Sequence, residues 1–313
     1  MKLKDTFEKQ GGMTLLKRYW KSGSFFTAVG EFLLLGKSRT ALEILRLSTQ
    51  LKTKQKLERE YKNKLEIFDQ NYDTTLPHVQ SNKVWICWFQ GMDQAPALVQ
   101  KCYESIKRNL SDREIILITY DNMKKYVSFP EEIQKKINSG IIKGAHLSDL
   151  LRLELLLKYG GTWIDATVYC SSSDIPDYML NSELFLFQNL KPGRDGHATV
   201  ISNWFITASA NNRILAAVQY LLYDYWENNN DFIDYFIFHI LFQITIEKYS
   251  EEWDKVVPFS NSTPHILLLK LFEKYDEKIW MAVKEQTPFH KLSYKFKEEQ
   301  TKLTGTYYNV LFG

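Results

Sequence analysis

The tripeptide Asp165-Ala166-Thr167 is the part of this chain whose residue types and spacing first suggest chemistry. It lies inside an aromatic and β-branched stretch, residues 163–170, that predicts a buried strand. Side chains alternate along a strand, so the oxygens of Asp165 and Thr167 are expected on the same side, where they could hold a divalent cation, Mn²⁺ or Mg²⁺. The alternative is that Asp165 only caps a strand end. Buried charges are rare unless they are paired or coordinated, which favours a ligand-binding role.

A second polar cluster, formed by Ser148, Asp149 and Arg152, precedes this strand in a leucine-rich stretch. Because these residues are three and four positions apart, a helix would place them on the same face. The free N–H groups at the start of such a helix suit an anionic ligand. An N-cap with a local Asp149–Arg152 ion pair is the alternative, and the sequence leaves both open.

Two tryptophans belong to an earlier apolar run, residues 84–89, which predicts another buried strand. Trp85 is expected in the core. Trp88 lies near the end of the run, just before a loop that begins with Gln90, and its ring could stack on a nucleotide base. A core position is the alternative for Trp88 as well.

An aromatic, apolar stretch around residue 236 holds two further titratable groups, Asp234 and His239. A carboxyl group inside an apolar helix is either paired or has a raised pKa, which suits acid–base work. Asp234 is therefore a candidate for orienting an acceptor hydroxyl or accepting its proton, with a structural hydrogen bond as the alternative. A glycine-containing loop, residues 191–199, includes His197 and could close over a bound ligand.

The elements that must position these residues alternate between strands and helices from about residue 83 onward. Strands are expected at residues 84–89, 114–119 and 163–170, and helices at residues 96–110, 131–140 and 148–161. Such alternation predicts an α/β sheet, in which ligands bind beyond the carboxyl ends of the strands. Trp88 and Asp165 both fall in that region.

The first 75 residues differ from the rest of the chain. They contain 15 lysines and arginines against 9 acidic residues, a net charge of +6 in a chain whose total is +3. Thr40 and Glu43 match a capping box and predict the start of a helix. Residues 52–68 are charged with sparse apolar positions, which indicates a solvated helix or a packing arm. We therefore expect a basic helical segment, residues 1–75, followed by the α/β domain, residues 76–313.

Composition excludes several classes of protein. A chain of 313 residues is long enough for one large domain, or for one domain with a small addition. Its net charge of +3 is too small to indicate a nucleic-acid-binding protein. The three cysteines lack metal-ligand spacing and do not suggest a disulfide framework, so a cytosolic location is expected. Neither a cleaved secretion signal nor a membrane-spanning run is expected.

Two stretches together resemble glycosyltransferases of the DxD sugar-binding type. They are residues 84–91, VWICWFQG, and residues 145–168, AHLSDLLRLELLLKYGGTWIDATV. This group includes capsular polysaccharide synthesis proteins, outer-chain mannosyltransferases and glucosylating toxins, and the chain is most similar to the capsular proteins. Thr167 stands where the second aspartate of the DxD motif would be.

The resemblance implies a type-A glycosyltransferase fold, which is a Rossmann-like mixed sheet, a nucleotide-sugar donor such as a UDP-sugar, and transfer of a hexose with retention of configuration. Asp165 would be the first acid of the motif and the main catalytic residue, and Asp234 is the second catalytic candidate. The expected donor-binding residues are Trp88, Gln90, Asp149, Arg152, Trp163, Asn203 and Lys291. The neighbouring Trp204 is expected close to the sugar as well.

The resemblance also implies a cation at the donor diphosphate. His290 would join Asp165 and Thr167 as a ligand of Mn²⁺ or Mg²⁺, or would contact phosphate. Lys291 or Lys295 would bind the diphosphate and so compensate for the loss of the second acid, which Thr167 replaces. A surface turn with ordinary lysines is the alternative. Front-side attack, in which the leaving phosphate takes the acceptor proton, is the mechanism that the resemblance implies.

A lipid-linked oligosaccharide is the expected acceptor, in bacterial capsule or surface polysaccharide synthesis. The basic N-terminal segment carries aromatic residues that favour an anionic lipid surface, at Tyr19, Trp20, Phe25 and Phe26. A peripheral position on the inner face of the plasma membrane follows, with a helical subdomain that packs on the α/β domain as the alternative. Two other functions stay open: a sugar-phosphate or nucleotidyl transferase, and a catalytically degenerate sugar-nucleotide-binding protein.

Overall fold

The computed structural model describes residues 12–191 and 198–313, so the predicted loop residue His197 lies outside the described residues. A mixed sheet with the strand order β2-β1-β3-β6-β5 forms the centre of the molecule. Its strands are β1 (Lys83–Cys87), β2 (Glu114–Ile118), β3 (Gly161–Ile164), β5 (Leu184–Gln188) and β6 (Ile201–Ala208). Strand β1 runs parallel to β2 and β3, whereas β6 runs antiparallel to β3 and β5. The expected α/β class with a mixed sheet is confirmed.

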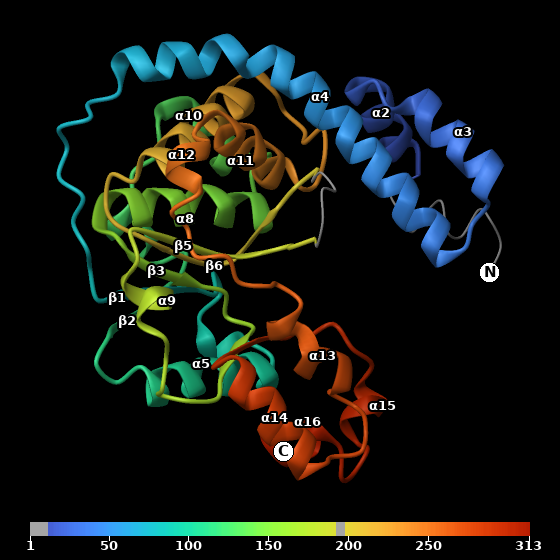
Figure 1. Ribbon diagram of the computed structural model, residues 1–313, viewed down its shortest axis with the longest axis vertical. Helices are drawn as coiled ribbons and strands as arrows, with labels where there is room; N and C mark the ends of the chain where they lie inside the picture. The colour runs from blue at the N-terminus through green and yellow to red at the C-terminus, as the bar shows by residue number, and fades with distance from the viewer. Residues whose placement is uncertain (1–11, 192–197) are drawn as a thin grey trace.

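Helices cover both faces of this sheet (Figure 1). One face carries α8 (Ala145–Tyr159) and α11 (Ile237–Lys248), with α10 (Arg213–Asn228) packed on both of them, and the other carries α5 (Ala97–Asn109). Helix α8 is leucine-rich around its whole circumference because it is buried between the sheet and α10. Trp85 is fully buried on the α8 face, as predicted, and its indole N–H donates to the carbonyl oxygen of Gly160 at 2.9 Å.

The join between α8 and β3 is tight and depends on two glycines. Gly160 has a φ of 67° and Gly161 a φ of 97°, in the region that disfavours other residues. A Cβ atom on Gly161 would lie 2.3 Å from the carbonyl oxygen of Lys83. This close approach lets β3 enter the sheet directly beside β1. It thereby positions Asp165, the residue that follows β3.

The remaining elements surround this core. Near the sheet lie η1 (Met92–Gln94), α6 (Met123–Tyr126), α7 (Glu131–Asn138), α9 (Asp177–Asn181) and α12 (Ser250–Trp253). The C-terminal part holds η2 (Thr263–His265), α13 (Ile266–Lys270), α14 (Glu277–Gln286), α15 (Glu298–Thr301) and α16 (Tyr307–Phe312). It also contains β7 (Phe289–Lys291), which pairs antiparallel with β4 (Val168–Cys170) in a second, small sheet.

The predicted strand at residues 163–170 is in fact two strands in two sheets. Strand β3 ends at Ile164, and the N–H of Val168 closes a turn by donating to the carbonyl oxygen of Asp165 at 3.0 Å. The chain then continues as β4 in the small sheet. The prediction of one continuous strand is therefore wrong, because the polar tripeptide forms the turn at which the chain leaves the main sheet.

Helix α4 (Arg39–Asn71) is a single helix of 33 residues. The hydroxyl of Ser38 caps it by accepting from the N–H of Ala41 at 3.1 Å, so the predicted capping box at Thr40 is wrong. The second half of α4 packs into the main core through Leu57, Tyr61, Leu65 and Phe68. It also makes ion pairs with α10 and α11, which join Lys64 to Asp224 and Lys54 to Glu247. This half of the N-terminal segment is therefore a packing arm and not a solvated helix.

The first half of α4 projects away from the sheet together with α2 (Gly12–Ser22) and α3 (Phe25–Leu35) (Figure 1). Large apolar side chains of α2 and α3 are exposed, among them Trp20 (68%), Phe26 (78%), Leu33 (78%) and Leu34 (84%). No helix in the described part of the chain has the length and apolar character needed to cross a membrane.

Candidate active site

The carboxyl ends of β1 and β3 meet the beginning of the antiparallel strand β6 at one edge of the sheet. Trp88 follows β1, and Asp165 follows β3. The backbone N–H of Asp165 donates to the carbonyl oxygen of Trp204 in β6 at 2.8 Å, which brings the neighbouring Asn203 to the same edge. The sheet topology thus collects residues that are far apart in the chain.

Asp165 is bonded through both of its carboxylate oxygens. The indole N–H of Trp163 donates to Oδ1 at 3.0 Å, and Nζ of Lys291 donates to Oδ2 at 2.7 Å. The guanidinium of Arg152 lies 3.7 Å from Oδ1. Burial by itself would raise the pKa of Asp165, but the Lys291 and Arg152 cations outweigh it and lower this pKa below its ordinary value. Asp165 is therefore a paired, ionised carboxylate at neutral pH.

Lys291 also contacts Thr167. Its ammonium donates to Oγ1 of Thr167 at 2.7 Å, the same length as its bond to Asp165. Antiparallel pairing of β4 with β7 places Val168 opposite Lys291, and the N–H of Leu292 donates to the carbonyl oxygen of Thr167 at 2.9 Å. The register of the small sheet therefore places the ammonium of Lys291 between Oδ2 of Asp165 and Oγ1 of Thr167.

His290 does not reach this cluster. It is fully buried, its Nε2 shares a hydrogen bond of 2.9 Å with the hydroxyl of Ser171, and its ring packs against Trp280. The placement predicted for His290 is wrong because consecutive residues of a strand point to opposite faces, and Lys291 is the one that points into the site. Burial lowers the pKa of His290 to about 3, so its ring is neutral at physiological pH.

The residues present do not form a divalent-metal site in this arrangement. Of the three predicted ligands, His290 lies elsewhere, and Asp165 and Thr167 are both bonded to Lys291. Throughout the described residues, no group of three or more His, Cys, Asp or Glu side chains could hold a metal ion. The positive charge at this edge comes instead from the side chains of Lys291 and Arg152.

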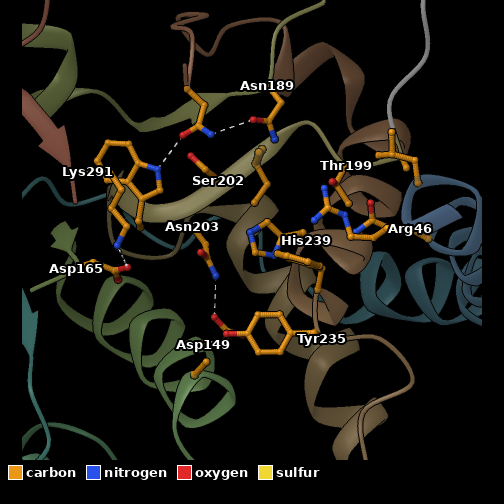
Figure 2. Close-up of a pocket in the computed structure, with 18 of the residues that line it drawn as sticks. Arg46, Asp149, Asp165, Asn189, Thr199, Ser202, Asn203, Tyr235, His239 and Lys291 are labelled. Atoms are coloured by element: carbon orange, nitrogen blue, oxygen red, sulfur yellow. Dashed lines mark hydrogen bonds and ion pairs between the residues drawn. The ribbon is translucent and has the colours of Figure 1, made fainter. Parts of the chain in front are cut away.

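Asp149 and Arg152 form a second ion pair beside Asp165, as their spacing predicts. A nitrogen of Arg152 lies 3.1 Å from Oδ1 of Asp149, and the amide of Asn203 donates to the same oxygen at 2.8 Å (Figure 2). Arg152 also donates to the backbone carbonyl of Asn203 at 2.8 Å. Burial raises the pKa of Asp149 to about 7, although Arg152 opposes this shift.

Helix α8 begins earlier than the sequence indicates. Its N-cap is Gly144, so Ser148 lies in the second turn and accepts a hydrogen bond of 3.3 Å from Arg152. The predicted cap at Ser148 is wrong, but the shared face of the three polar residues is present. It is this face, and not the first-turn N–H groups, that meets Asp165.

Two cavities join at this cluster. The tryptophan cavity, lined by Trp88, Gln90, Trp163, Thr167, Tyr294 and Lys295 among others, has a volume of about 1070 Å³. The histidine cavity, lined by Asp149, Ser202, Asn203, Trp204, His239 and Arg46 among others, has a volume of about 570 Å³. Arg152, Asp165 and Lys291 line both cavities. The reacting centre of any two-substrate reaction would lie where these cavities meet.

The tryptophan cavity combines aromatic rings with an excess of positive charge. Trp88 meets Tyr294 edge to face, with ring centroids 5.5 Å apart. The indole N–H of Trp88 is buried and has no hydrogen-bond partner among the described residues. The charged side chains that line the cavity are Arg18, Lys143, Arg152, Lys291 and Lys295 against Asp165 and Asp231. Such a surface suits an aromatic, anionic ligand.

The histidine cavity has a different character. His239 faces it from α11, Tyr235 from the segment just before α11, and Arg46 from α4 (Figure 2). Burial, with a smaller contribution from the nearby Arg152, lowers the pKa of His239 to about 3, so the ring is neutral. Nδ1 of His239 is buried and has no partner among the described residues. Neutral polar groups of this kind suit hydroxyl-bearing ligands.

Asp234 lies outside both cavities. It precedes α11, where its carboxylate accepts from the N–H of Phe236 at 2.8 Å. It lines a third, arginine cavity of about 670 Å³, whose other charged residues are Arg18, Arg39, Glu43 and Arg46. The expectation of an acid within a helix at the reacting centre is wrong, because the helix begins three residues later and turns this side chain toward α4. Burial raises the pKa of Asp234.

A family model described as capsular polysaccharide synthesis protein matches residues 38–311, from the N-cap of α4 almost to the end of the chain. The chain belongs to this family. The O-glycosyltransferase braB of Annulohypoxylon truncatum is 34% identical over 102 residues, a match that covers 30% of this chain but only 24% of that protein. The solved structure of the PaToxG glycosyltransferase covers 82% of this chain and 96% of its own, with 15% identity and a TM-score of 0.37.

In this capsular-family chain, sequence reasoning missed Arg46 and Tyr294 as residues that line the site. Arg46 belongs to the N-terminal segment, which was expected to contact membrane and not to line a cavity. Tyr294 lies four residues after His290, within a stretch in which only the histidine and the lysines suggest a function. Aromatic and basic side chains on a short strand and the loop after it were the available signal.

Proposed function

We propose that this protein is a retaining glycosyltransferase that moves a hexose from a nucleotide-diphosphate sugar, such as a UDP-sugar, to a lipid-linked oligosaccharide in surface polysaccharide synthesis. The observation that carries the proposal is the position of Asp165, Arg152 and Lys291 at the junction of two cavities of unlike chemistry. Membership of the capsular polysaccharide synthesis family supports it. Retention and the hexose follow from the family resemblance.

The donor would occupy the tryptophan cavity. Trp88 and Tyr294 offer aromatic surface to the base, and a stacked base contributes about 1–3 kcal/mol in comparable cases. The cations of this cavity would face the diphosphate. During transfer, negative charge develops on the leaving diphosphate, and Lys291 and Arg152 would stabilise it in a site already organised to do so.

The acceptor would approach through the histidine cavity. Neutral His239 and Tyr235 offer polar contacts to sugar hydroxyls, while Asp165 would hold the donor from the other side. We assign no side chain as the base: the leaving phosphate itself takes the acceptor proton in the front-side mechanism. Asp234, in the arginine cavity, would then have a structural role in the wall behind Arg46.

The lipid part of the acceptor would lie along the N-terminal helices. The histidine and arginine cavities share Glu43, Arg46, Tyr235 and Phe236, so a continuous path leads from the reacting centre toward α2. Arg39 and Arg46 are two helical turns apart and suit the phosphate that links a saccharide to its lipid. Beyond them lie the exposed apolar side chains of α2 and α3, which favour a peripheral position on an anionic membrane face.

A donor screen followed by product analysis tests the enzymatic proposal. Thermal unfolding with each of several nucleotide sugars should identify a donor by a rise in melting temperature, and transfer to a lipid-linked acceptor should follow. Asp165→Asn should lower transfer by about 10²–10³-fold while the protein stays folded. Transfer of sugar phosphate or nucleotide would favour the rival transferase, and binding without any turnover would favour a degenerate binding protein.

Vesicle flotation tests the membrane proposal. Deleting residues 1–75 is unsuitable, because α4 supplies Leu57 and Phe68 to the main core. The full chain with Phe26→Ser and Leu34→Ser should instead lose its association with vesicles that contain anionic lipid. Leu269→Ser is the matched control, since Leu269 is 77% exposed but lies in α13. Equal flotation of all variants would exclude this surface as the anchor.

A further inference from the structure

The missing second acid of the motif and the position of Lys291 are two parts of one arrangement. The ammonium of Lys291 lies 2.7 Å from Oδ2 of Asp165 and 2.7 Å from Oγ1 of Thr167, where two oxygens would otherwise hold a metal ion. Figure 2 shows the side chain of Lys291 pointing to Asp165, with a dashed line between the two. Residues 126 positions apart in the chain thus form a cation site whose cation is part of the protein.

We infer that the ammonium of Lys291 serves as the resident cation of the donor site and binds the donor diphosphate in place of a divalent metal ion. This inference rests on the proposed function, because it assigns a ligand to the same cleft. An ammonium carries three N–H donors, and the contacts to Asp165 and Thr167 use two of them. The third remains for a phosphate oxygen at the junction of the two cavities.

The side chain is held in place by its surroundings. On either side of Lys291 in the chain, His290 is fully buried and Leu292 is 2% exposed, which anchors the backbone of β7. The side chain of Lys291 is only 18% exposed and that of Asp165 is 27% exposed. Moving the ammonium aside to admit a metal ion would leave one buried cation unpaired and place two like charges close together, and both are unfavourable.

The identity of Thr167 agrees with this arrangement. A second aspartate would add a negative charge beside an ammonium that Asp165 already neutralises, and would weaken its attraction for phosphate. A threonine hydroxyl accepts the hydrogen bond without adding charge. Arg152 is paired with both Asp149 and Asp165, so the surplus of positive charge that faces a ligand comes from Lys143 and Lys295 on the cavity wall, and a second aspartate would reduce it. Lysine at position 291 and threonine at position 167 therefore act as a pair.

Calorimetric titration of the full chain with UDP and with GDP, in excess chelator and in Mn²⁺, tests the inference. The wild-type dissociation constant of whichever nucleotide binds should differ by less than about threefold between the two conditions. Lys291→Met should weaken binding in chelator by about 10–100-fold, the loss expected for one charge-assisted hydrogen bond. Lys54→Met is the matched control, since Lys54 makes a 2.6 Å ion pair with Glu247 and is similarly buried, but lies outside the site.

An exchange of the pair gives the second test. Thr167→Asp combined with Lys291→Met restores two carboxylates and removes the ammonium, so nucleotide binding should become dependent on Mn²⁺ by about tenfold or more. Wild-type binding that is lost in chelator would overturn the inference, as would a Lys291→Met variant that binds like wild type without metal. Those outcomes leave the transferase proposal standing, whereas failure of every nucleotide and nucleotide sugar to bind in either condition would overturn both.

Discussion

The indole N–H of Trp163 donates a 3.0 Å hydrogen bond to Oδ1 of Asp165, two residues further along the chain. Trp163 is only 1% exposed, and the guanidinium of Arg152 lies 5.0 Å from the centroid of its ring. Core packing therefore determines how the carboxylate is turned, with Oδ2 toward Lys291. A site oriented in this way before its ligand arrives needs little reorganisation during the reaction.

Replacing Trp163 by phenylalanine should separate the effect of its hydrogen bond to Asp165 from the effect of its buried ring on packing. Trp163→Phe keeps most of the buried ring but removes the hydrogen bond to Asp165, so transfer should fall by about tenfold or more. Trp226→Phe is the control, because Trp226 is also 1% exposed but its indole N–H has no partner among the described residues. Equal activity of the two variants, both folded by circular dichroism, would show that the Trp163 hydrogen bond does not matter.

Trp88 should contribute to binding of the nucleotide. Trp88→Leu removes the ring and the buried indole N–H, which should weaken nucleotide affinity by about 1–3 kcal/mol. Titration of the nucleotide against both proteins measures the loss. Trp20→Leu provides the comparison, since Trp20 is 68% exposed on α2, and it should bind nucleotide like wild type. An unchanged affinity for Trp88→Leu would place the base elsewhere.

Arg46 should act on the acceptor and not on the donor. Arg46→Ala should raise the KM for a phosphate-linked acceptor by about 10–100-fold, because a charge-assisted hydrogen bond is lost, with the donor KM unchanged. Steady-state kinetics with each substrate varied in turn provides the measurement. Arg59→Ala removes the same charge from an exposed position of α4 outside the cavities, and should leave both constants as they are. A rise in donor KM alone would contradict the assignment.

His290 should influence stability through pH. Its pKa is lowered to about 3 in the folded protein by burial and by the nearby Lys284, from an ordinary value of 6.5. Below pH 6.5 the unfolded chain therefore binds a proton that the folded chain does not, so stability is lost as the pH falls toward the folded pKa. His290→Asn should lose less stability than wild type between roughly pH 6.5 and 4.5.

Denaturant unfolding at each pH measures that difference, with nucleotide titration at neutral pH as the companion experiment. Nucleotide affinity of His290→Asn should equal that of wild type, because the ring bonds to Ser171 and not to Asp165. If His290→Asn is folded but binds nucleotide much more weakly than wild type, His290 takes part in the donor site after all. An identical pH slope in both proteins would contradict the buried, neutral imidazole.

Local patterns in the sequence were sufficient for much of the scaffold. The strands β1 and β2 lie within two residues of their predicted bounds, since aromatic and β-branched composition is a local property of the chain. Asp149 and Arg152 share a helix face because helical periodicity requires it. Parallel strands end at one edge of a sheet, which placed Trp88 and Asp165 together. The errors at Ser148 and Thr40 are displaced helix starts, which depend on weak capping preferences.

The sequence by itself determined the α/β class, the buried strands and the acid with its neighbouring arginine, because each depends on spacing between residues that are close in the chain. Only the tertiary structure decided which C-terminal side chain meets Asp165. The register between β4 and β7 turns Lys291 toward the site and the buried His290 away from it, and a shift of one residue would reverse them. That register comes from pairing across more than a hundred residues, which no local pattern encodes.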